Sequence, residues 1–130
     1  MQDRPTYDEL LKAVEGFLDN EIVPNVPGSR GFHARVAANA IRIVRRELAL
    51  EDEQLAAEWQ GLDAILGHAG TPQRRAELRE AIIKRNEALC AVIRDGGADE
   101  GEKARSVFEH VKRTVQDKLR VSDPDLLERS

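Results

Sequence analysis

The sequence predicts an all-α protein, an antiparallel bundle of four to five helices. Good helix formers such as Ala, Leu, Glu and Arg fill most positions, and aromatic residues make up only 4% of the chain. No run shows the period-two alternation that is typical of a β-strand. The chain has 130 residues, enough for one domain with one core, so we expect a single helical domain over residues 1–130.

The first helix is expected to begin at a capping box. Thr6 precedes Glu9 by three residues, so each side chain can bond to the other's free backbone N–H. The helix should end near Ile22, because residues 23–31 hold two prolines and two glycines. Helical spacing predicts one apolar stripe, made of Leu10, Val14, Phe17 and Leu18. The side chains expected to face water are Lys12, Glu15 and Asp19.

A long second helical segment follows this loop. It is expected to begin at Gly31 or Phe32. It ends either at Leu50 or, after a bend near the acidic residues 51–53, at Leu66, and the pattern leaves both alternatives open. In its second half, apolar residues share one face: Leu55, Trp59, Leu62 and Leu66.

Two further long helices complete the expected bundle. After residues 67–72, the third helix is predicted to start with Thr71 as N-cap and Pro72 at its first position. The last long helix should run from about Glu102 to Val121, before a turn into a short cap or tail. The expected apolar stripe of the third helix is Leu78, Ile82, Leu89 and Ile93. That of the last helix is Val107, Phe108, Val111, Val115 and Leu119.

Charge and composition exclude several classes of partner. The 24 acidic residues outnumber the 20 basic ones, which gives a net charge of -4 and argues against nucleic-acid binding. No run approaches the ~18 apolar residues that span a membrane, and the N-terminal residues do not resemble a signal peptide. The lone cysteine, Cys90, is expected in the core and cannot form an internal disulfide. These features predict a cytoplasmic protein.

Motifs for catalysis and for cofactors are not found in the sequence. The three histidines, His33, His68 and His110, do not have the spacing of a metal site, and no paired cysteines occur. Neither a phosphate-binding glycine loop nor a dinucleotide-binding motif is present. We therefore predict no catalytic residue, no metal ligand and no cofactor, although catalytic groups can still converge from separate helices.

A polar stripe runs along the second helix. At about 100° of rotation per residue, its members fall within an arc of roughly 60°. They are Arg35, Asn39, Arg42 and Arg46. Two interpretations stay open, a face that is simply solvated or a site that binds an anion or a partner, since the arginine fork suits carboxylate and phosphate groups. His33 points towards the apolar side of the same helix instead.

Three segments resemble a small bacterial family of domains of unknown function. They are residues 4–18 (RPTYDELLKAVEGFL), 32–48 (FHARVAANAIRIVRREL) and 114–127 (TVQDKLRVSDPDLL). The matching core comprises Phe32, His33, Arg35, Val36, Ala37, Ala38 and Asn39. Asp123 departs from the pattern, because an asparagine is more usual before Pro124. Members of this family commonly occur beside, or fused to, kinases of the aminoglycoside-phosphotransferase type that act on hydroxyacyl-CoA intermediates.

The resemblance implies a non-catalytic accessory or binding subunit of such a kinase. The predicted contact residues are Arg35, Asn39, Arg42 and Arg46, with His33 and Lys118 as secondary members. The expected partners are the kinase and a CoA-linked ligand. One alternative is a stand-alone enzyme that acts on a small acidic or CoA-linked substrate with His33 as general base. Another is a homo-oligomer that pairs through exposed apolar residues such as Trp59.

Overall fold

The computed structural model describes residues 3–129 and confirms the predicted all-α helical bundle. Met1, Gln2 and Ser130, which belong to the predicted domain of residues 1–130, lie outside the described residues. The elements in order are α1 (Tyr7–Phe17) with its π-helical continuation η1 (Leu18–Ile22), α2 (Ser29–Leu66), α3 (Arg75–Arg94), α4 (Gly101–Ser122) and α5 (Pro124–Arg129). No strand occurs within residues 3–129.

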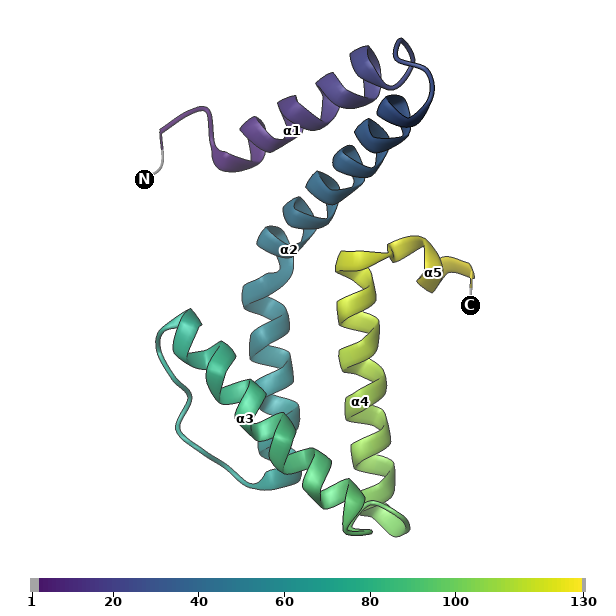
Figure 1. The fold of residues 1–130 in the computed structure, drawn as a ribbon. Helices are drawn as coiled ribbons and strands as arrows, with labels where there is room; N and C mark the ends of the chain where they lie inside the picture. Colours follow the sequence, from purple (N-terminus) through teal and green to yellow (C-terminus); the bar gives the residue numbers. More distant parts are fainter. Residues whose placement is uncertain (1–2, 130) are drawn as a thin grey trace.

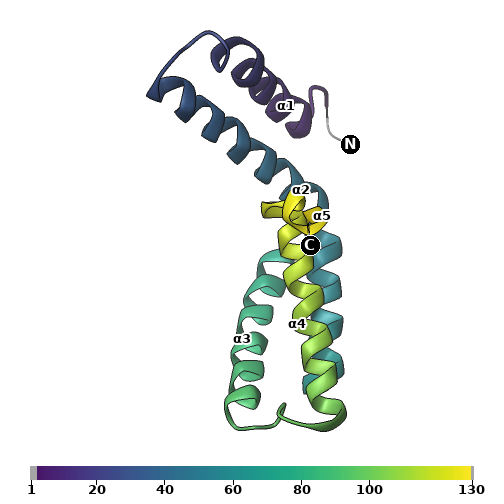
Figure 2. The ribbon, with the colours of Figure 1, turned by 90° about the vertical axis from the view of Figure 1, so that its right-hand side faces the viewer.

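Helix α2, 38 residues long, connects two groups of helices (Figure 1). Its N-terminal half pairs with α1 in a hairpin, and its C-terminal half packs with α3 and α4 in what we call the lower bundle. Figure 2 shows that α2 changes direction between the two halves, so the molecule is elongated. Of the two predicted ends of this helix, Leu50 and Leu66, the structure shows the second, because α2 is one continuous helix to Leu66.

Contacts with α3 explain why α2 remains helical through its acidic residues. Arg75 binds Asp52 with Nε–Oδ1 at 2.8 Å, and Arg79 binds Glu51. The carboxylates that suggested a break are thus the points where another helix attaches. Arginine–carboxylate pairs of this kind are charge-assisted hydrogen bonds, which are stronger than neutral ones.

The start of α1 and the loop after it follow from local chemistry. Both bonds of the predicted capping box are present, since Thr6 Oγ1 accepts from the backbone N–H of Glu9 at 3.2 Å and the Glu9 carboxylate accepts from the backbone N–H of Thr6 at 3.4 Å. The helical path ends at Ile22, as predicted. Gly31 then allows the first turn of α2 to lie close to the preceding loop, because a Cβ at this position would lie 2.0 Å from the carbonyl oxygen of Val26. Helix α2 therefore begins within the predicted loop, at Ser29.

The hydrophobic core lies in the lower bundle. Trp59 is only 4% exposed, so the expectation of an exposed tryptophan that pairs subunits is wrong. The guanidinium of Arg85 lies 4.8 Å from the centre of the Trp59 ring and also binds Asp63. The buried cluster consists of Trp59, Leu62, Ile65, Ile82, Leu89 and Val107.

Helix α3 starts later than predicted. It begins at Arg75 after Arg74, which makes no side-chain cap, so the prediction of Thr71 and Pro72 at its start is wrong. Residues 67–74 connect the end of α2 to the start of α3. Within this connection, the backbone N–H of Ala69 donates to the Asp63 carboxylate. Cys90 is exposed on α3, which corrects its placement in the core.

Helix α4 buries a different face from the one predicted. Val107 is buried, but the other members of the expected stripe include the exposed side chains of Phe108, Val111 and Val115. His110 takes their place in the core at 3% exposure. The reason is Gly61 of α2, which leaves the space that the imidazole fills.

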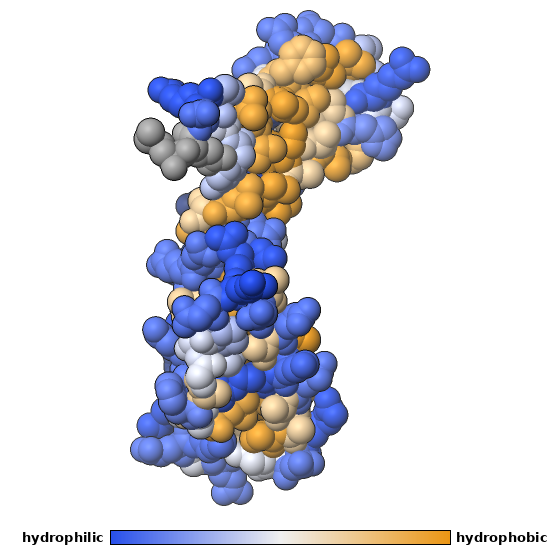
Figure 3. Space-filling model, turned by 90° about the vertical axis from the view of Figure 1, so that its left-hand side faces the viewer, coloured by the Kyte–Doolittle hydropathy of each residue, from blue (hydrophilic) through white to orange (hydrophobic). Residues whose placement is uncertain are grey.

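The hairpin buries little of its apolar surface. Three of the four residues in the predicted stripe, Leu10, Val14 and Phe17, are each about half exposed, whereas Leu18 is partly buried. Figure 3 shows that hydrophobic side chains form a continuous band over the hairpin, whereas the lower bundle shows only smaller separate patches on this side. No helix within residues 3–129 has the length and apolar character needed to cross a lipid bilayer.

Candidate functional site

The polar stripe of α2 divides into two free and two bonded residues. Arg35 and Asn39 are exposed, and neither side chain has a hydrogen bond or ion pair among the described residues. Arg42 and Arg46 are partly buried and bind other helices. The stripe is therefore neither uniformly solvated nor uniformly available for a partner.

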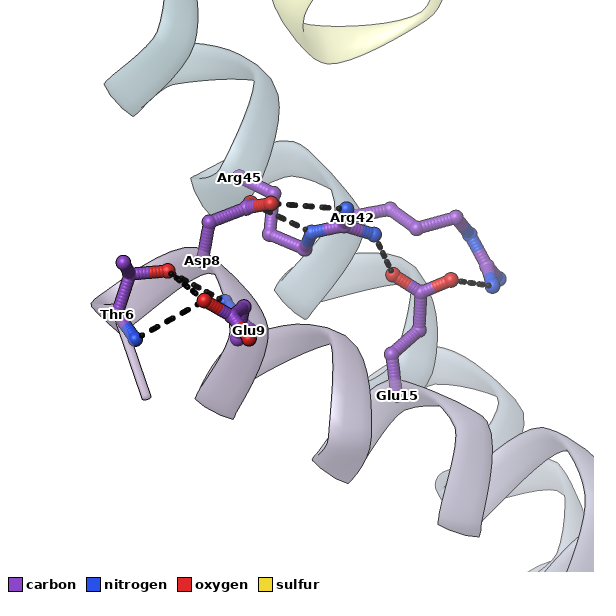
Figure 4. A network of polar contacts seen from close by, with 6 residues as sticks. All are labelled: Thr6, Asp8, Glu9, Glu15, Arg42 and Arg45. Atoms are coloured by element: carbon purple, nitrogen blue, oxygen red, sulfur yellow. Dashed lines mark hydrogen bonds and ion pairs between the residues drawn. The ribbon is translucent and has the colours of Figure 1, made fainter. Parts of the chain in front are cut away.

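Arg42 holds the hairpin together (Figure 4). Its Nη1 donates to Asp19 at 2.6 Å and to Glu15 at 3.4 Å. The hydrogen bond to Asp19 raises the pKa of Arg42, so the guanidinium stays charged. These bonds correct the expectation that Glu15 and Asp19 only face water.

Arg45, which the sequence analysis did not single out, supplies the second hairpin contact. Its Nε donates to Asp8 at 2.9 Å and its Nη1 to Glu15 at 2.9 Å, as Figure 4 shows. The hydrogen bond from Arg45 lowers the pKa of the Asp8 carboxyl, and the same bond raises the pKa of Arg45. A signal for this contact was present, because spacings of seven and four place Asp8 and Glu15 of α1 and Asp19 of η1 on one side of the helical path.

Arg46 joins α2 to the end of α4. Its Nε donates to the backbone carbonyl of Val121 at 2.7 Å. The last four carbonyls of a helix have no partner within the helix, so this side chain satisfies one of them. The contact brings the second and third segments of the family resemblance together, although they are far apart in the sequence.

A pocket of about 460 Å³ lies at this junction. Its wall on α2 is formed by Asn39 together with Arg42 and Arg46. The opposite wall is the α4–α5 junction, made of Ser122, Asp123, Pro124 and Asp125. The site thus mixes two arginines with two carboxylates, a set that can make hydrogen bonds of either sense to a partner.

Asp123 fixes the far wall of this pocket. The backbone N–H of Leu126 donates to its Oδ1 at 3.3 Å and to its backbone carbonyl at 3.1 Å. This is the pattern of an N-cap followed by proline at the first helical position. Asp123 therefore starts α5.

Two of the predicted site residues lie elsewhere. His33 is exposed, with its ring edge-to-face against Phe32 at 5.8 Å between centroids. Lys118 lines a separate pocket of about 360 Å³ together with Glu47, Glu51 and hydrophobic residues of α2 and α3. The structure thus brings Asn39, Arg42 and Arg46 together with the α4–α5 junction, but not His33 or Lys118.

Other pockets adjoin the stripe. One of about 410 Å³ lies between α1 and α2, and its lining shares Arg42 and Arg46 with the junction pocket. Arg35 lines a smaller hollow of about 240 Å³ beside the loop before α2. Within residues 3–129, no group of three or more His, Cys, Asp or Glu side chains is placed to hold a metal ion.

Comparison with known proteins gives one match. A sequence model of the family described as "Domain of unknown function (DUF6285)" matches residues 24–126, most of the chain. The matched region begins in the loop before α2 and ends within α5, so it includes the polar stripe and the junction pocket. Neither a curated protein nor a solved structure matches the chain.

Proposed function

The chain belongs to the DUF6285 family, and we propose that it is a non-catalytic accessory subunit of an aminoglycoside-phosphotransferase-like kinase that acts on hydroxyacyl-CoA intermediates. The kinase and its substrate class come from the resemblance of the three segments described above. The contact face, which we call the arginine face, comprises Asn39 and Arg46 of α2 beside the α4–α5 junction, and Arg35 one turn earlier on the same side of α2.

One observation supports a binding role for this face. Arg35 and Asn39 project from a rigid helix and have no partner among the described residues, while Arg46 is held at the edge of a pocket by Val121. Because the Val121 carbonyl already holds Arg46, this side chain would lose little conformational entropy on binding. The free guanidinium of Arg35 can bind a carboxylate with two parallel hydrogen bonds.

The charges of the pocket favour a protein surface over a phosphate. Asp123 and Asp125 line the wall that faces Arg46, and their carboxylates would repel a phosphate placed there. A partner protein can instead offer both acceptors and donors. Arg42 takes a positioning role in this proposal, since its guanidinium is engaged by Asp19 and Glu15.

The test is affinity purification of the tagged chain from lysate of its source cells, with mass spectrometry of the retained proteins. We expect a phosphotransferase-type kinase with the wild type and its loss with Arg35→Glu. The matched control is Arg105→Glu, because Arg105 is exposed on α4, away from the face, and is also without a partner in the described chain.

Two results would contradict the proposal: a wild type that retains no such kinase, or an Arg35→Glu variant that retains it fully. Circular dichroism and the fluorescence of the single, buried Trp59 confirm that each variant is folded. Titration with coenzyme A tests the CoA-linked ligand separately.

The stand-alone enzyme remains an alternative prediction. It requires His33 to act within a pocket, and His33 lines none of the four pockets described above. No observation on the described residues favours it over the accessory role. Turnover of a hydroxyacyl-CoA by the isolated protein, lost in His33→Gln, would reverse this preference.

A further inference from the structure

The hairpin has an apolar face that no other part of residues 3–129 covers. On α1 its largest exposed members are Leu10, Val14 and Phe17. On α2 exposed residues recur every four positions and form what we call the α2 ridge: Phe32, Val36, Ala40, Val44 and Leu48. The four large residues of this ridge are each between 40% and 60% exposed, so the ridge is open to solvent.

The α2 ridge winds around its helix relative to the side that faces α1. The side of α2 that faces α1 carries the buried residues Ala34 and Ala38. Rotation about the helix axis in one direction from this side reaches the arginine face. Val44 and Leu48 of the α2 ridge lie in the other direction, Ala40 and Val36 point away from the buried alanines, and Phe32 lies beside Asn39 of the arginine face. Figure 3 looks onto the side turned away from α4 and α5 and shows the apolar band there. The hairpin is therefore amphipathic, and its apolar face extends around α2 until it adjoins the arginine face at Phe32 and Asn39.

The exposed area is that of an interface. The seven large side chains on the two helices are each about half exposed, and at ~200 Å² per large side chain they present roughly 600–700 Å² of apolar surface. Isolated apolar patches on monomers seldom exceed a few hundred Å². A standard protein–protein interface buries about 800 Å² on each partner, so this face alone nearly suffices for a stable dimer.

We propose that a second copy of this chain covers the face, with the two α2 helices antiparallel and crossing at Ala40. The α2 ridge is symmetric in sequence about that residue, so a twofold axis there opposes Val36 to Val44 of the second copy, with Phe32 and Leu48 at the margins of the contact. Ridges of residues four apart pack into each other in the commonest class of helix crossing. The small central alanine lets the two backbones approach.

Polar complementarity supports the same register. The polar residues within the exposed apolar arc of α2 are His33 and Glu47, and they also lie at equal distances from Ala40. The twofold axis therefore places each imidazole opposite the carboxylate of the other copy. With α1 added from both copies, the result is two helical hairpins packed face to face, which closes the layer that one hairpin leaves open.

The oligomeric state tests this proposal. Sedimentation equilibrium should give twice the 14.5 kDa chain mass for the wild type and the single-chain mass for Val36→Glu at the same concentration. Val115→Glu is the matched control, because Val115 of α4 is exposed to nearly the same extent, 49% against 51%. The fluorescence of Trp59 verifies that the lower bundle stays folded in both variants.

A cysteine on the axis tests the register. Ala40→Cys in a Cys90→Ser background should form a disulfide-linked dimer on oxidation, since residues at a twofold axis meet their own copies. Val115→Cys in the same background should not. A monomeric wild type, a dimer that survives Val36→Glu, or a dimer lost in Val115→Glu overturns the proposal. Arg35→Glu should leave the dimer intact, so failure of this proposal is distinguishable from failure of the kinase-binding role.

Discussion

The Nε of Arg46 lies 2.7 Å from the backbone carbonyl of Val121, and this hydrogen bond joins the middle of α2 to the last turn of α4. A cation at this place also interacts favourably with the negative end of the helix dipole. The bond fixes the α4–α5 junction against α2 and so determines the shape of the junction pocket. The hairpin and the lower bundle are connected here as well as through α2 itself.

Arg46→Gln should lower the free energy of unfolding by about 1 kcal/mol, the usual net value of one hydrogen bond. Urea denaturation followed by Trp59 fluorescence measures the change. Arg105→Gln is the control, because it removes an exposed arginine of α4 that has no partner among the described residues. Equal effects of the two substitutions would show that the Val121 contact contributes nothing.

Arg45→Gln should loosen α1 without unfolding the lower bundle. Arg45 bonds to Asp8 and Glu15, and the apolar side of α1 adds little packing on α2 within one chain. Hydrogen exchange should become faster across residues 7–17 in this variant and stay unchanged in α3. Arg120→Gln, which breaks a pair with Asp117 inside α4, is the control and should leave α1 protected.

The same contact predicts acid sensitivity of the hairpin. Arg45 lowers the pKa of Asp8, so the folded state binds the proton of this carboxyl less well than the unfolded state. The stabilisation is present above the ordinary pKa of 3.8 and is lost as the pH falls through the lowered value. The hydrogen-exchange rates of α1 in the wild type should approach those of Arg45→Gln only when the pH falls through the lowered pKa of Asp8. Convergence of the two near neutral pH would refute the assignment.

His110 should make the lower bundle less stable below neutral pH. Burial lowers the pKa of its imidazole, with Arg113 acting in the same direction and Glu58 opposing it. The unfolded state therefore binds the proton first, and stability decreases as the pH falls below the ordinary value of 6.5. The urea midpoint should fall between about pH 7.5 and 5.5 in the wild type, and His110→Leu should remove most of this decrease. An unchanged slope in the variant would contradict the prediction.

Gly61→Ala should destabilise the lower bundle by about 1–3 kcal/mol, the usual range for overpacking. The new Cβ would lie 2.1 Å from Nδ1 of His110. Gly16→Ala in α1 is the control, because the nearest atom there is 3.9 Å away, and it should be neutral or stabilising. Combining Gly61→Ala with His110→Ala should cost less than the sum of the two single changes. Additive costs would mean that the two residues do not interact.

Local signals predicted most helices correctly. Thr6 and Glu9 cap α1 as expected, and α4 spans Gly101–Ser122, close to the predicted range of Glu102 to Val121. These features depend on residues close in sequence. The arc of Arg35, Asn39, Arg42 and Arg46 was also predictable, because helical rotation alone defines it.

The remaining features depend on tertiary neighbours that periodicity does not reveal. Phe108, Val111 and Val115 have the spacing of a core stripe, yet α2 packs against the side of α4 that carries Val107 and His110. The roles of Arg42 and Arg46 likewise required the positions of α1 and α4. Only the arrangement of the helices separates these bonded arginines from the free side chain of Arg35.

Native mass spectrometry of the assembly purified from source cells tests most directly the claim that two faces of the hairpin bind at once. We predict a complex with two copies of this chain joined through the α2 ridge, together with a phosphotransferase-type kinase held at the arginine face. A kinase complex with one copy of the chain would contradict the dimer, and two copies without a kinase would contradict the accessory role.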